Sequence, residues 1–198
     1  MVQGGRTMIH PPIHLRQATA KDNRLVAELG ARTFGDTFGP DNTPEDMAAY
    51  LASAFGPRQQ AAELADTGTV FLVAEVEGES VGYARMKQGP APACIIGQRP
   101  VEIARLYAIA PWIGRGVGAA LMRGCLAQAQ QRGCDVVWLD VWERNTRAIA
   151  FYRQWGFADV GTQQFVLGSD VQHDLLMARA VEIEGSAALG GRAGAPAG

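Results

Sequence analysis

The sequence predicts a single α/β domain built around a mixed β-sheet. Three observations support this expectation. Apolar residues recur at helical spacing in the first third of the chain, up to about residue 65. From residue 69 the apolar period becomes that of β-strands, in two runs joined by a short glycine-containing connection. The last part alternates strand and helix before two closing strands, an order typical of one α/β domain.

The first half of the chain is expected to form a strand, three helices and a β-hairpin. Thr19 is suited to cap the first helix, and Thr43 followed by Pro44 is suited to begin the second. Residues 34–42 are rich in turn-forming residues and are expected to form a loop that exposes two aromatic side chains. Helices are thus predicted over 21–33, from Pro44 onward and over 58–65, and strands over 13–18, 69–76 and 81–87.

The second half is expected to alternate strands and helices. A glycine-rich turn over 111–118 separates a strand from a helix, and Gly133 and Gly156 stop the two helices of this half. Strands are predicted over 101–109, 136–141, 157–160 and 170–180, and helices from 118 to 132 and over 146–155.

Composition excludes several classes of protein. A net charge of −2 provides no basic field for nucleic acid or an anionic membrane, and no apolar run is long enough to span a bilayer. The cysteines are odd in number and lack C-x-x-C spacing, and the three histidines are scattered, so neither a metal nor a disulfide framework is expected. We expect a cytoplasmic protein with a flexible segment over 1–9, one domain over 10–183 and a disordered Gly/Ala tail over 184–198.

The glycine-rich turn is the strongest chemical signal. Gly114, Gly116 and Gly118 alternate between a predicted strand and a predicted helix. Without Cβ atoms, successive N–H groups can face one ligand, and the helix dipole adds positive charge, so the turn suits a phosphate or pyrophosphate. The alternative is a tight turn whose glycines serve packing alone. The spacing matches neither the dinucleotide-binding fingerprint G-x-G-x-x-G nor the P-loop.

Four linked pieces of the sequence resemble the GNAT superfamily of acetyl-CoA-dependent N-acetyltransferases. They are the strand over 102–109, the turn Gly114–Gly118, the strand over 136–141, and Asn145-x-x-Ala148-x-x-Phe151-Tyr152-x-x-x-Gly156-Phe157. Ile113 departs from the family's usual Gln or Arg. The resemblance implies a mostly antiparallel central sheet flanked by helices and splayed between its two central strands. It also implies acetyl-CoA as co-substrate, bound by Leu106, Tyr107, Ala108, Gly114, Arg115, Gly116, Val117, Gly118, Ala119, Asn145 and Tyr152.

The resemblance also suggests catalytic residues. Tyr152 matches the family's general acid, which gives a proton to the departing sulfur, although an aromatic residue at this helical position can equally be core. The N–H of Ala108 is expected to polarise the thioester carbonyl. Glu102 and Asp140 both match positions where family members place a general base, and we favour Glu102 over Asp140. Water alone remains a third option.

The acceptor is expected to be a small cationic amine. The stretch T-F-x-D-T-F-G places Phe34, Asp36 and Phe38 close together, which suits ion pairing and cation–π contact, although acidic residues near a helix start need no ligand. This stretch and F-V-x-G-x-D-x-x-x-D-L-x-M, over 165–177, resemble PaiA-type and spermidine/spermine-type acetyltransferases. They imply direct transfer to a polyamine in a ternary complex.

Other functions remain open from the sequence. The same cofactor site can serve a GNAT enzyme acting on a protein N-terminus or an aminoglycoside. A non-catalytic acyl-CoA-binding regulator and a nucleotide-binding protein are the alternatives outside this enzyme class. A homodimer through the late strands is also open, since Trp138, Trp142 and Phe165 suit either a subunit interface or the core.

Overall fold

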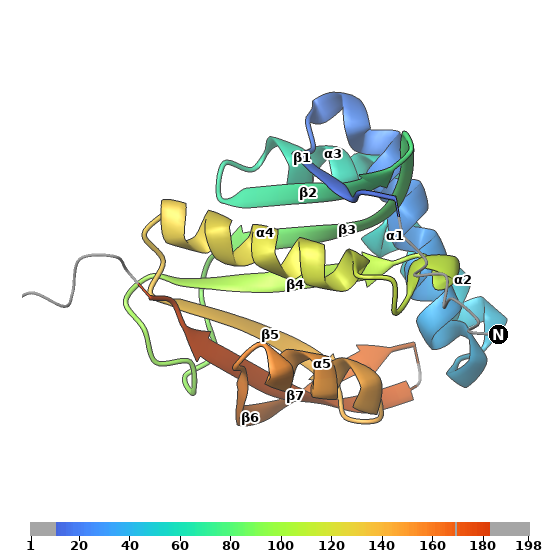
Figure 1. Ribbon diagram of the computed structural model, residues 1–198. Coiled ribbons are helices and arrows are strands. Elements are labelled where there is room, and N and C mark those ends of the chain that lie inside the picture. The colour runs from blue at the N-terminus through green and yellow to red at the C-terminus, as the bar shows by residue number, and fades with distance from the viewer. Residues whose placement is uncertain (1–10, 169, 183–198) are drawn as a thin grey trace, which may run out of the picture.

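The computed structural model describes residues 11–168 and 170–182 and contains one seven-stranded sheet. The strand order is β1-β2-β3-β4-β5-β7-β6, in which β4 and β5 are parallel and the other neighbours antiparallel (Figure 1). The predicted mixed, mostly antiparallel sheet is therefore confirmed. The flexible segment expected over 1–9 and the tail expected over 184–198 lie outside the described residues.

Most predicted elements form close to their expected bounds. The strands are β1 His14–Gln17, β2 Thr69–Val76, β3 Glu79–Gln88, β4 Pro100–Ala108, β5 Val136–Trp142, β6 Ala158–Leu167 and β7 Asp170–Ala180. The helices are α1 Asn23–Phe38, α2 Pro44–Ala54, α3 Pro57–Ala65, α4 Val117–Gln131 and α5 Thr146–Gln154. Short 3-10 turns occupy Ala20–Asp22, Gly39–Asp41 and Ala110–Trp112.

The loop predicted over 34–42 is wrong in its first half, because α1 continues to Phe38. Phe34 is 4% exposed and belongs to the core, so burial favours the longer helix over the local turn propensity. The hydroxyl of Thr37 donates to the carbonyl of Thr33 at 2.8 Å, which satisfies a polar group inside the helix. The helix ends just before Pro40, which cannot donate a backbone hydrogen bond.

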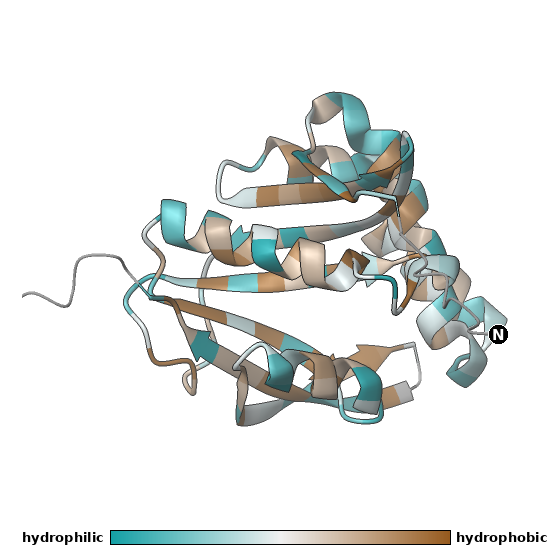
Figure 2. Ribbon diagram, viewed as in Figure 1, coloured by the Kyte–Doolittle hydropathy of each residue, from teal (hydrophilic) through white to brown (hydrophobic). Residues whose placement is uncertain are grey.

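The sheet carries helices on both faces. Helices α4 and α5 lie on one face, where Leu121 and Met122 pack against apolar residues of β2 and β3. Helices α1 to α3 lie on the other face, where Val26 and Phe71 belong to a second buried cluster. Figure 2 shows hydrophobic residues along the strands and between polar residues along the helices. Within the described residues, every helix is too short or too polar to span a lipid bilayer.

The close approach of α4 to the sheet depends on Gly82 of β3. A Cβ at this position would lie 2.6 Å from the carbonyl oxygen of Tyr107 and 2.9 Å from Cγ1 of Val117. Both neighbours belong to the elements that begin and end the glycine-rich connection between β4 and α4. Gly82 therefore allows the first turn of α4 to rest on the end of β4.

The two parallel strands separate after a short junction. Pairing of β4 with β5 covers Pro100–Glu102 and Val136–Trp138, after which the strands diverge (Figure 1). The register of β4 with β3 skips Ala104, which marks a β-bulge at the point of divergence. Because one extra residue reverses the side-chain alternation, Ile103 and Leu106 both face the α4 side of the sheet. The expected splay between the central strands is present.

Candidate active site

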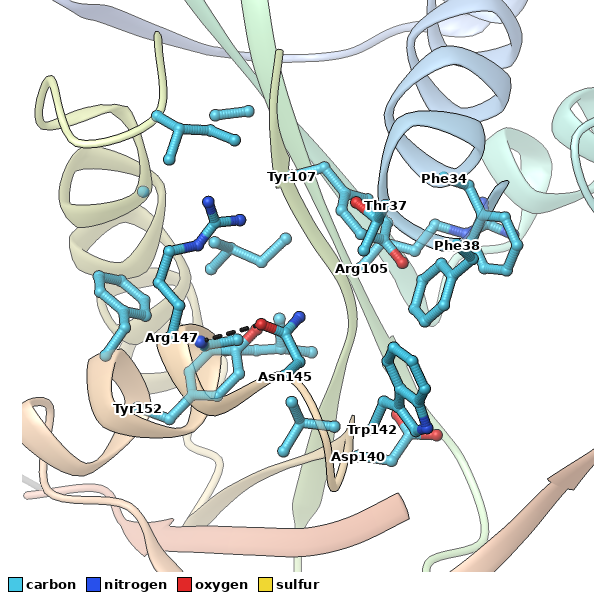
Figure 3. A pocket seen from close by; sticks show the side chains of 18 of the residues that line it. Phe34, Thr37, Phe38, Arg105, Tyr107, Asp140, Trp142, Asn145, Arg147 and Tyr152 are labelled. Atoms are coloured by element: carbon cyan, nitrogen blue, oxygen red, sulfur yellow. Dashed lines mark hydrogen bonds between the residues drawn. The ribbon is translucent and has the colours of Figure 1, made fainter. Parts of the chain in front are cut away.

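A cavity of about 770 Å³ occupies the splay between β4 and β5. It extends from the turn before α4 to aromatic side chains of α1, α2 and β6. In Figure 3, side chains from α1 and β4 face Asn145, Arg147 and Tyr152 across the opening, and Asp140 and Trp142 of β5 lie below the α1 and β4 side chains. Among residues 11–168 and 170–182, no cluster of His, Cys, Asp or Glu is arranged to hold a metal ion.

The start of α4 is suited to hold an anion through backbone N–H groups. Gly114 and Gly116 have φ angles of 78° and 89°, in the left-handed region that glycine adopts without strain. The first helical hydrogen bond runs from the Ala120 N–H to the Gly116 carbonyl at 2.9 Å. The N–H groups of Val117, Gly118 and Ala119 therefore have no partner within the helix and lie at its positive end. This geometry fits the pyrophosphate of CoA.

The residues of this turn differ in their placement relative to the cavity. Gly114, Gly116, Gly118 and Ala119 line the cavity, whereas Val117 is fully buried beneath the turn. Arg115 is exposed, and its guanidinium lies 5.7 Å from the ring centre of Trp112. The expected contribution of Arg115 and Val117 thus rests on their backbone.

Asn145 lies at the opposite side of the same opening. Its Oδ1 accepts a hydrogen bond from the Ala148 N–H at 3.2 Å and so caps α5. The side chain also lines the cavity, as does that of its neighbour Arg147. Arg147 was not anticipated from the sequence, and it adds a cation on the cofactor side of the opening.

The edge of β4 that faces the cavity carries backbone groups that do not pair with β5. The Ile109 N–H donates to the carbonyl of Val81, in β3, at 2.9 Å. Since N–H groups alternate between the two edges of a strand, the N–H of Ala108 points the other way, into the splay. Leu106, Tyr107 and Ala108 all line the cavity. The Ala108 N–H is therefore placed to donate to a carbonyl lying between the strands.

Tyr152 of α5 combines a packed ring with an available hydroxyl. The side chain is 9% exposed, and its ring lies 5.5 Å from that of Phe151 and 5.9 Å from that of Phe157. Burial, reinforced by the Asp140 carboxylate, raises the pKa of the phenol, which stays protonated at neutral pH. In the described part of the chain, no hydrogen bond to this hydroxyl is found, although the residue lines the cavity.

The structure separates the two carboxylates considered as base. Asp140 lines the cavity, and its Oδ2 accepts from Nε2 of Gln163 at 2.9 Å. Burial raises the pKa of Asp140, and the hydrogen bond from Gln163 opposes this shift. Glu102 does not line the cavity and pairs with Nζ of Lys87 at 3.1 Å. Burial raises the pKa of Glu102 as well, against the attraction of Lys87.

Aromatic rings form the end of the cavity at α1, α2 and β6. Phe34 and Phe38 lie 4.4 Å apart between ring centres, and Phe34 stacks on Tyr50 at 4.6 Å. Phe38 lies 5.9 Å from Trp142, and Tyr50 lies 5.7 Å from Phe165. All five rings line the cavity. Such a set of ring faces suits an extended cation.

Two of the three residues expected to bind the acceptor therefore reach the cavity. Phe34 and Phe38 lie on its wall, whereas Asp36 is exposed and does not line it. The reason is helical geometry: residues 34 and 38 lie one turn apart on the inner face of α1, and residue 36 lies on the opposite face. The negative charge of the cavity comes instead from Asp140 on β5 and Asp174 on β7.

A buried ion network lies behind the aromatic end. Arg105 lines the cavity, and its guanidinium binds both carboxylate oxygens of Glu63 at 2.7 and 3.1 Å. It also lies 4.7 Å from the ring centre of Phe55. Arg85 pairs with the same Glu63 at 3.1 Å. The network ties α3 to β3 and β4 and fixes the Arg105 side chain on the cavity wall.

Several residues of the cavity wall have no role that the sequence predicts. Asp174 lies in the late motif over 165–177 without an assigned function, and Gln172 is at an unspecified position of the same motif. Their spacing of two along a strand, on a face expected to be buried, is the signal that could have identified them. Trp142 was expected to be core or interface and Tyr50 had no assigned role, because their position near α1 depends on the tertiary fold.

Comparison with known proteins places this geometry in a family. Residues 30–157 match the model of the Acetyltransferase (GNAT) family. An uncharacterized N-acetyltransferase of Lactobacillus delbrueckii subsp. lactis is 32% identical over 169 residues, covering 85% of this chain and 98% of the relative. The aminoglycoside N(6')-acetyltransferase type 1 of Stenotrophomonas maltophilia is 28% identical over 146 residues, covering 73% and 86% respectively.

A solved structure shows the same fold. The crystal structure of PaiA N-acetyltransferase from Thermoplasma acidophilum in complex with coenzyme A matches with a TM-score of 0.70 and 18% identity, over 85% of this chain and 99% of that one. The splayed sheet and the glycine turn define an acetyltransferase that takes its acetyl group from acetyl-CoA. The chain belongs to the GNAT family, and it is an N-acetyltransferase.

Proposed function

We propose that this N-acetyltransferase acetylates a primary amine of a small polycation, with a polyamine as the preferred class, by direct attack in a ternary complex. The observation that carries the proposal is the acceptor end of the cavity. Two carboxylates, Asp140 and Asp174, lie there beside five aromatic rings. Carboxylates bind ammonium groups by charge-assisted hydrogen bonds, and ring faces attract the same cations.

The single cavity provides room for both reactants. When bound, acetyl-CoA supplies a thioester whose carbonyl carbon bonds to the amine nitrogen as the C–S bond breaks and the thiolate leaves with a proton. The glycine turn holds the pyrophosphate, and the unpaired edge of β4 orients the thioester arm. The Ala108 N–H donates to the carbonyl oxygen as negative charge develops there.

Asp140 is our candidate for the residue that removes the amine proton. It lines the cavity and lies close enough to Tyr152 to raise the pKa of that phenol. The geometry therefore favours Asp140 over Glu102, which is held by Lys87 outside the cavity wall. Tyr152 is the candidate proton donor to the sulfur, since its hydroxyl is protonated and available.

An aminoglycoside is the second candidate acceptor. It is favoured by the 28% identity to an aminoglycoside N(6')-acetyltransferase, and aminoglycosides are also polycations that carboxylates can bind. The two candidates share the cofactor site and the chemistry, and they differ in the size and stiffness of the acceptor.

A panel of acceptors tests the proposal. The full chain is incubated with acetyl-CoA and polyamines, aminoglycosides, free amino acids or peptides with free N-termini, and CoA release and acetylated products are measured. We expect kcat/KM to be highest for polyamines. A preference by orders of magnitude for another class would contradict the polyamine assignment, and CoA binding without transfer to any amine would indicate a regulator.

A further inference from the structure

Asp174 of β7 is a buried carboxylate that no part of the mechanism above uses for catalysis. The side chain is 7% exposed and lines the cavity. Its Oδ1 is fully buried, and among the described residues it has no hydrogen-bond partner. Native proteins rarely leave a buried carboxylate oxygen unpaired, because the charge loses its hydration without compensation. Asp174 is thus a poorly compensated carboxylate on the cavity wall, and a cation that enters the cavity would offset its charge.

The strand register places Asp174 beside Asp140 on the same face of the sheet. Trp142 pairs with Asp174 and Asp140 pairs with Leu176, so the two aspartates are diagonal neighbours. Diagonal residues on adjacent strands are typically about 7–8 Å apart between Cα atoms. The register of β6 places Phe165 opposite Gln172, one alternation further along the same face.

The two carboxylates lie at different distances along β5 from its junction with β4. The junction covers Val136–Trp138, and Asp174 lies opposite Trp142, two residues further from the junction than Asp140. Asp140 also raises the pKa of the Tyr152 phenol, whereas the groups that act on Asp174 are Asp140, Glu143 and His173. The charged and titratable groups around Asp174 come from α2, β4, β5, the turn after β5, and β7. They are Tyr50, Asp140, Glu143 and His173, and Arg105 of β4 lines the same cavity.

We propose that Asp174 binds a second ammonium group of the acceptor while Asp140 faces the amine that reacts, so that the enzyme selects acceptors with two positive charges. Trp142 and Phe165 then supply ring faces beside the bound ammonium. This inference rests on the proposed function, since it assigns the specificity-determining residue of the same acceptor site.

The proposal predicts a pH-dependent affinity. Burial, with repulsion from Asp140 and Glu143, raises the pKa of Asp174 to about 6 against a smaller opposing effect of His173. A diamine stays dicationic at this pH, whereas Asp174 loses its charge as the pH falls through 6. The affinity for a diamine is therefore expected to fall between pH 7 and pH 5, and an Asp174→Asn variant is expected to lose this dependence.

Calorimetric titration of the CoA-loaded full chain gives the decisive comparison. The ligands are 1,4-diaminobutane and butylamine, which differ by one charge. We expect the wild type to prefer the diamine and Asp174→Asn to lower the preference about tenfold or more, the effect of one hydrogen bond to a charged group. The matched control is Asp159→Asn, which alters a surface pair with Arg153 away from the cavity. His173→Gln is a second control: if the pH dependence of diamine affinity belongs to Asp174, this variant keeps it.

Thermal unfolding separates a binding role from a structural one. Because the raised pKa means that folded Asp174 resists ionisation, its charge destabilises the fold above pH 6 and has no effect below the unfolded pKa near 4. Asp174→Asn is therefore expected to raise the Tm at pH 7.5, by about 2–4 °C, and to leave it unchanged at pH 4. A carboxylate with a structural role would give a lower Tm. Asp174→Ser serves the same tests if the Asn variant does not fold.

The outcomes are distinguishable. An equal diamine preference in wild type and Asp174→Asn, or a wild type without preference or pH dependence, would overturn the role of Asp174. Diamine binding that depends on Asp174 without acetylation of any polyamine would support that role and contradict the proposed function. Acetylation of polyamines without dependence on Asp174 would support the proposed function and contradict the role of Asp174.

Discussion

In the proposed function, the two ends of the cavity recognise their ligands by different means. At the proposed cofactor end, backbone N–H groups of the α4 turn and of the β4 edge are available to the ligand, beside the side chains of Asn145 and Arg147. At the acceptor end, recognition falls to side chains from six elements: α1, α2, β4, β5, β6 and β7. Backbone N–H groups keep their positions as long as the fold is kept, whereas a site made of side chains changes with each substitution. The cofactor is thus fixed by the fold, and the acceptor is fixed by the residues placed on it.

Tyr152 stands where the two ends meet, and its substitution should have the largest effect. We expect Tyr152→Phe to lower kcat by about 100-fold or more, because general acid catalysis is lost while the ring keeps its packing. Stopped assays with saturating acetyl-CoA and acceptor, from pH 6 to 9, measure the effect. Full turnover at every pH would leave Tyr152 a core residue and would place the proton donor elsewhere.

Gly116 tests whether the cofactor end depends on backbone geometry. A Cβ there would meet only Cδ1 of Ile13 at 3.6 Å, so space is available, but the φ of 89° is strained for a branched side chain. We expect Gly116→Val to weaken acetyl-CoA binding about 10- to 100-fold, as measured by calorimetry. Gly89→Ala is the control, since a Cβ at Gly89 meets nothing within 4 Å. Unchanged affinity in Gly116→Val would show that side chains hold the cofactor after all.

Substitutions of the two candidate bases are expected to have different effects on kcat/KM for the acceptor. Asp140→Asn should lower kcat/KM for the acceptor by about tenfold or more, because it removes a carboxylate from the cavity wall. Glu102→Gln should change kcat/KM far less, since Glu102 pairs with Lys87 away from the wall. The opposite ranking would restore Glu102 as the base and would move proton removal to the cofactor strand.

Substitution of Asp36 is expected to have the smallest effect on kcat/KM, although the sequence predicts that Asp36 binds the acceptor. It is exposed on the outer side of α1, so Asp36→Asn should change acceptor kcat/KM by no more than about twofold, within the range of surface substitutions. Steady-state kinetics beside Asp140→Asn measure the difference. A loss comparable with that of Asp140→Asn would mean that α1 presents its outer face to the acceptor.

The glycine turn has a local signal, and the structure places it between β4 and α4 as the sequence predicts. Three glycines between a strand and a helix define the turn within five residues, and the Asn145–Phe157 motif follows at a fixed distance. The fold class followed from the same local periods, and the described sheet confirms it. The prediction for residues 34–38 is wrong because it rests on local turn-forming residues, glycine and threonine. The burial of Phe34, which favours the helix, depends on the tertiary fold.

The acceptor end was predicted only in part because its residues meet across long sequence distances. Phe38 and Trp142 are neighbours at 5.9 Å although more than one hundred positions separate them. Asp174 becomes a diagonal neighbour of Asp140 through the register of β5 with β7, which no period in either strand specifies. The choice between Glu102 and Asp140 likewise depends on which strand edge borders the cavity, a property of the bulge at Ala104 and of the splay that follows it.

The short junction between β4 and β5 has a thermodynamic consequence. Strands β1 to β4 and strands β5 to β7 share three residue pairs, so the sheet is joined across its middle by less pairing than at the seams on either side, β3–β4 and β5–β7. A ligand that bonds to the free edge of β4 and packs against β5 adds the missing connection and binds only the folded chain. By mass action, the free energy of unfolding then rises with the concentration of acetyl-CoA. The protein's resistance to unfolding is in this sense set by the supply of its own acetyl donor.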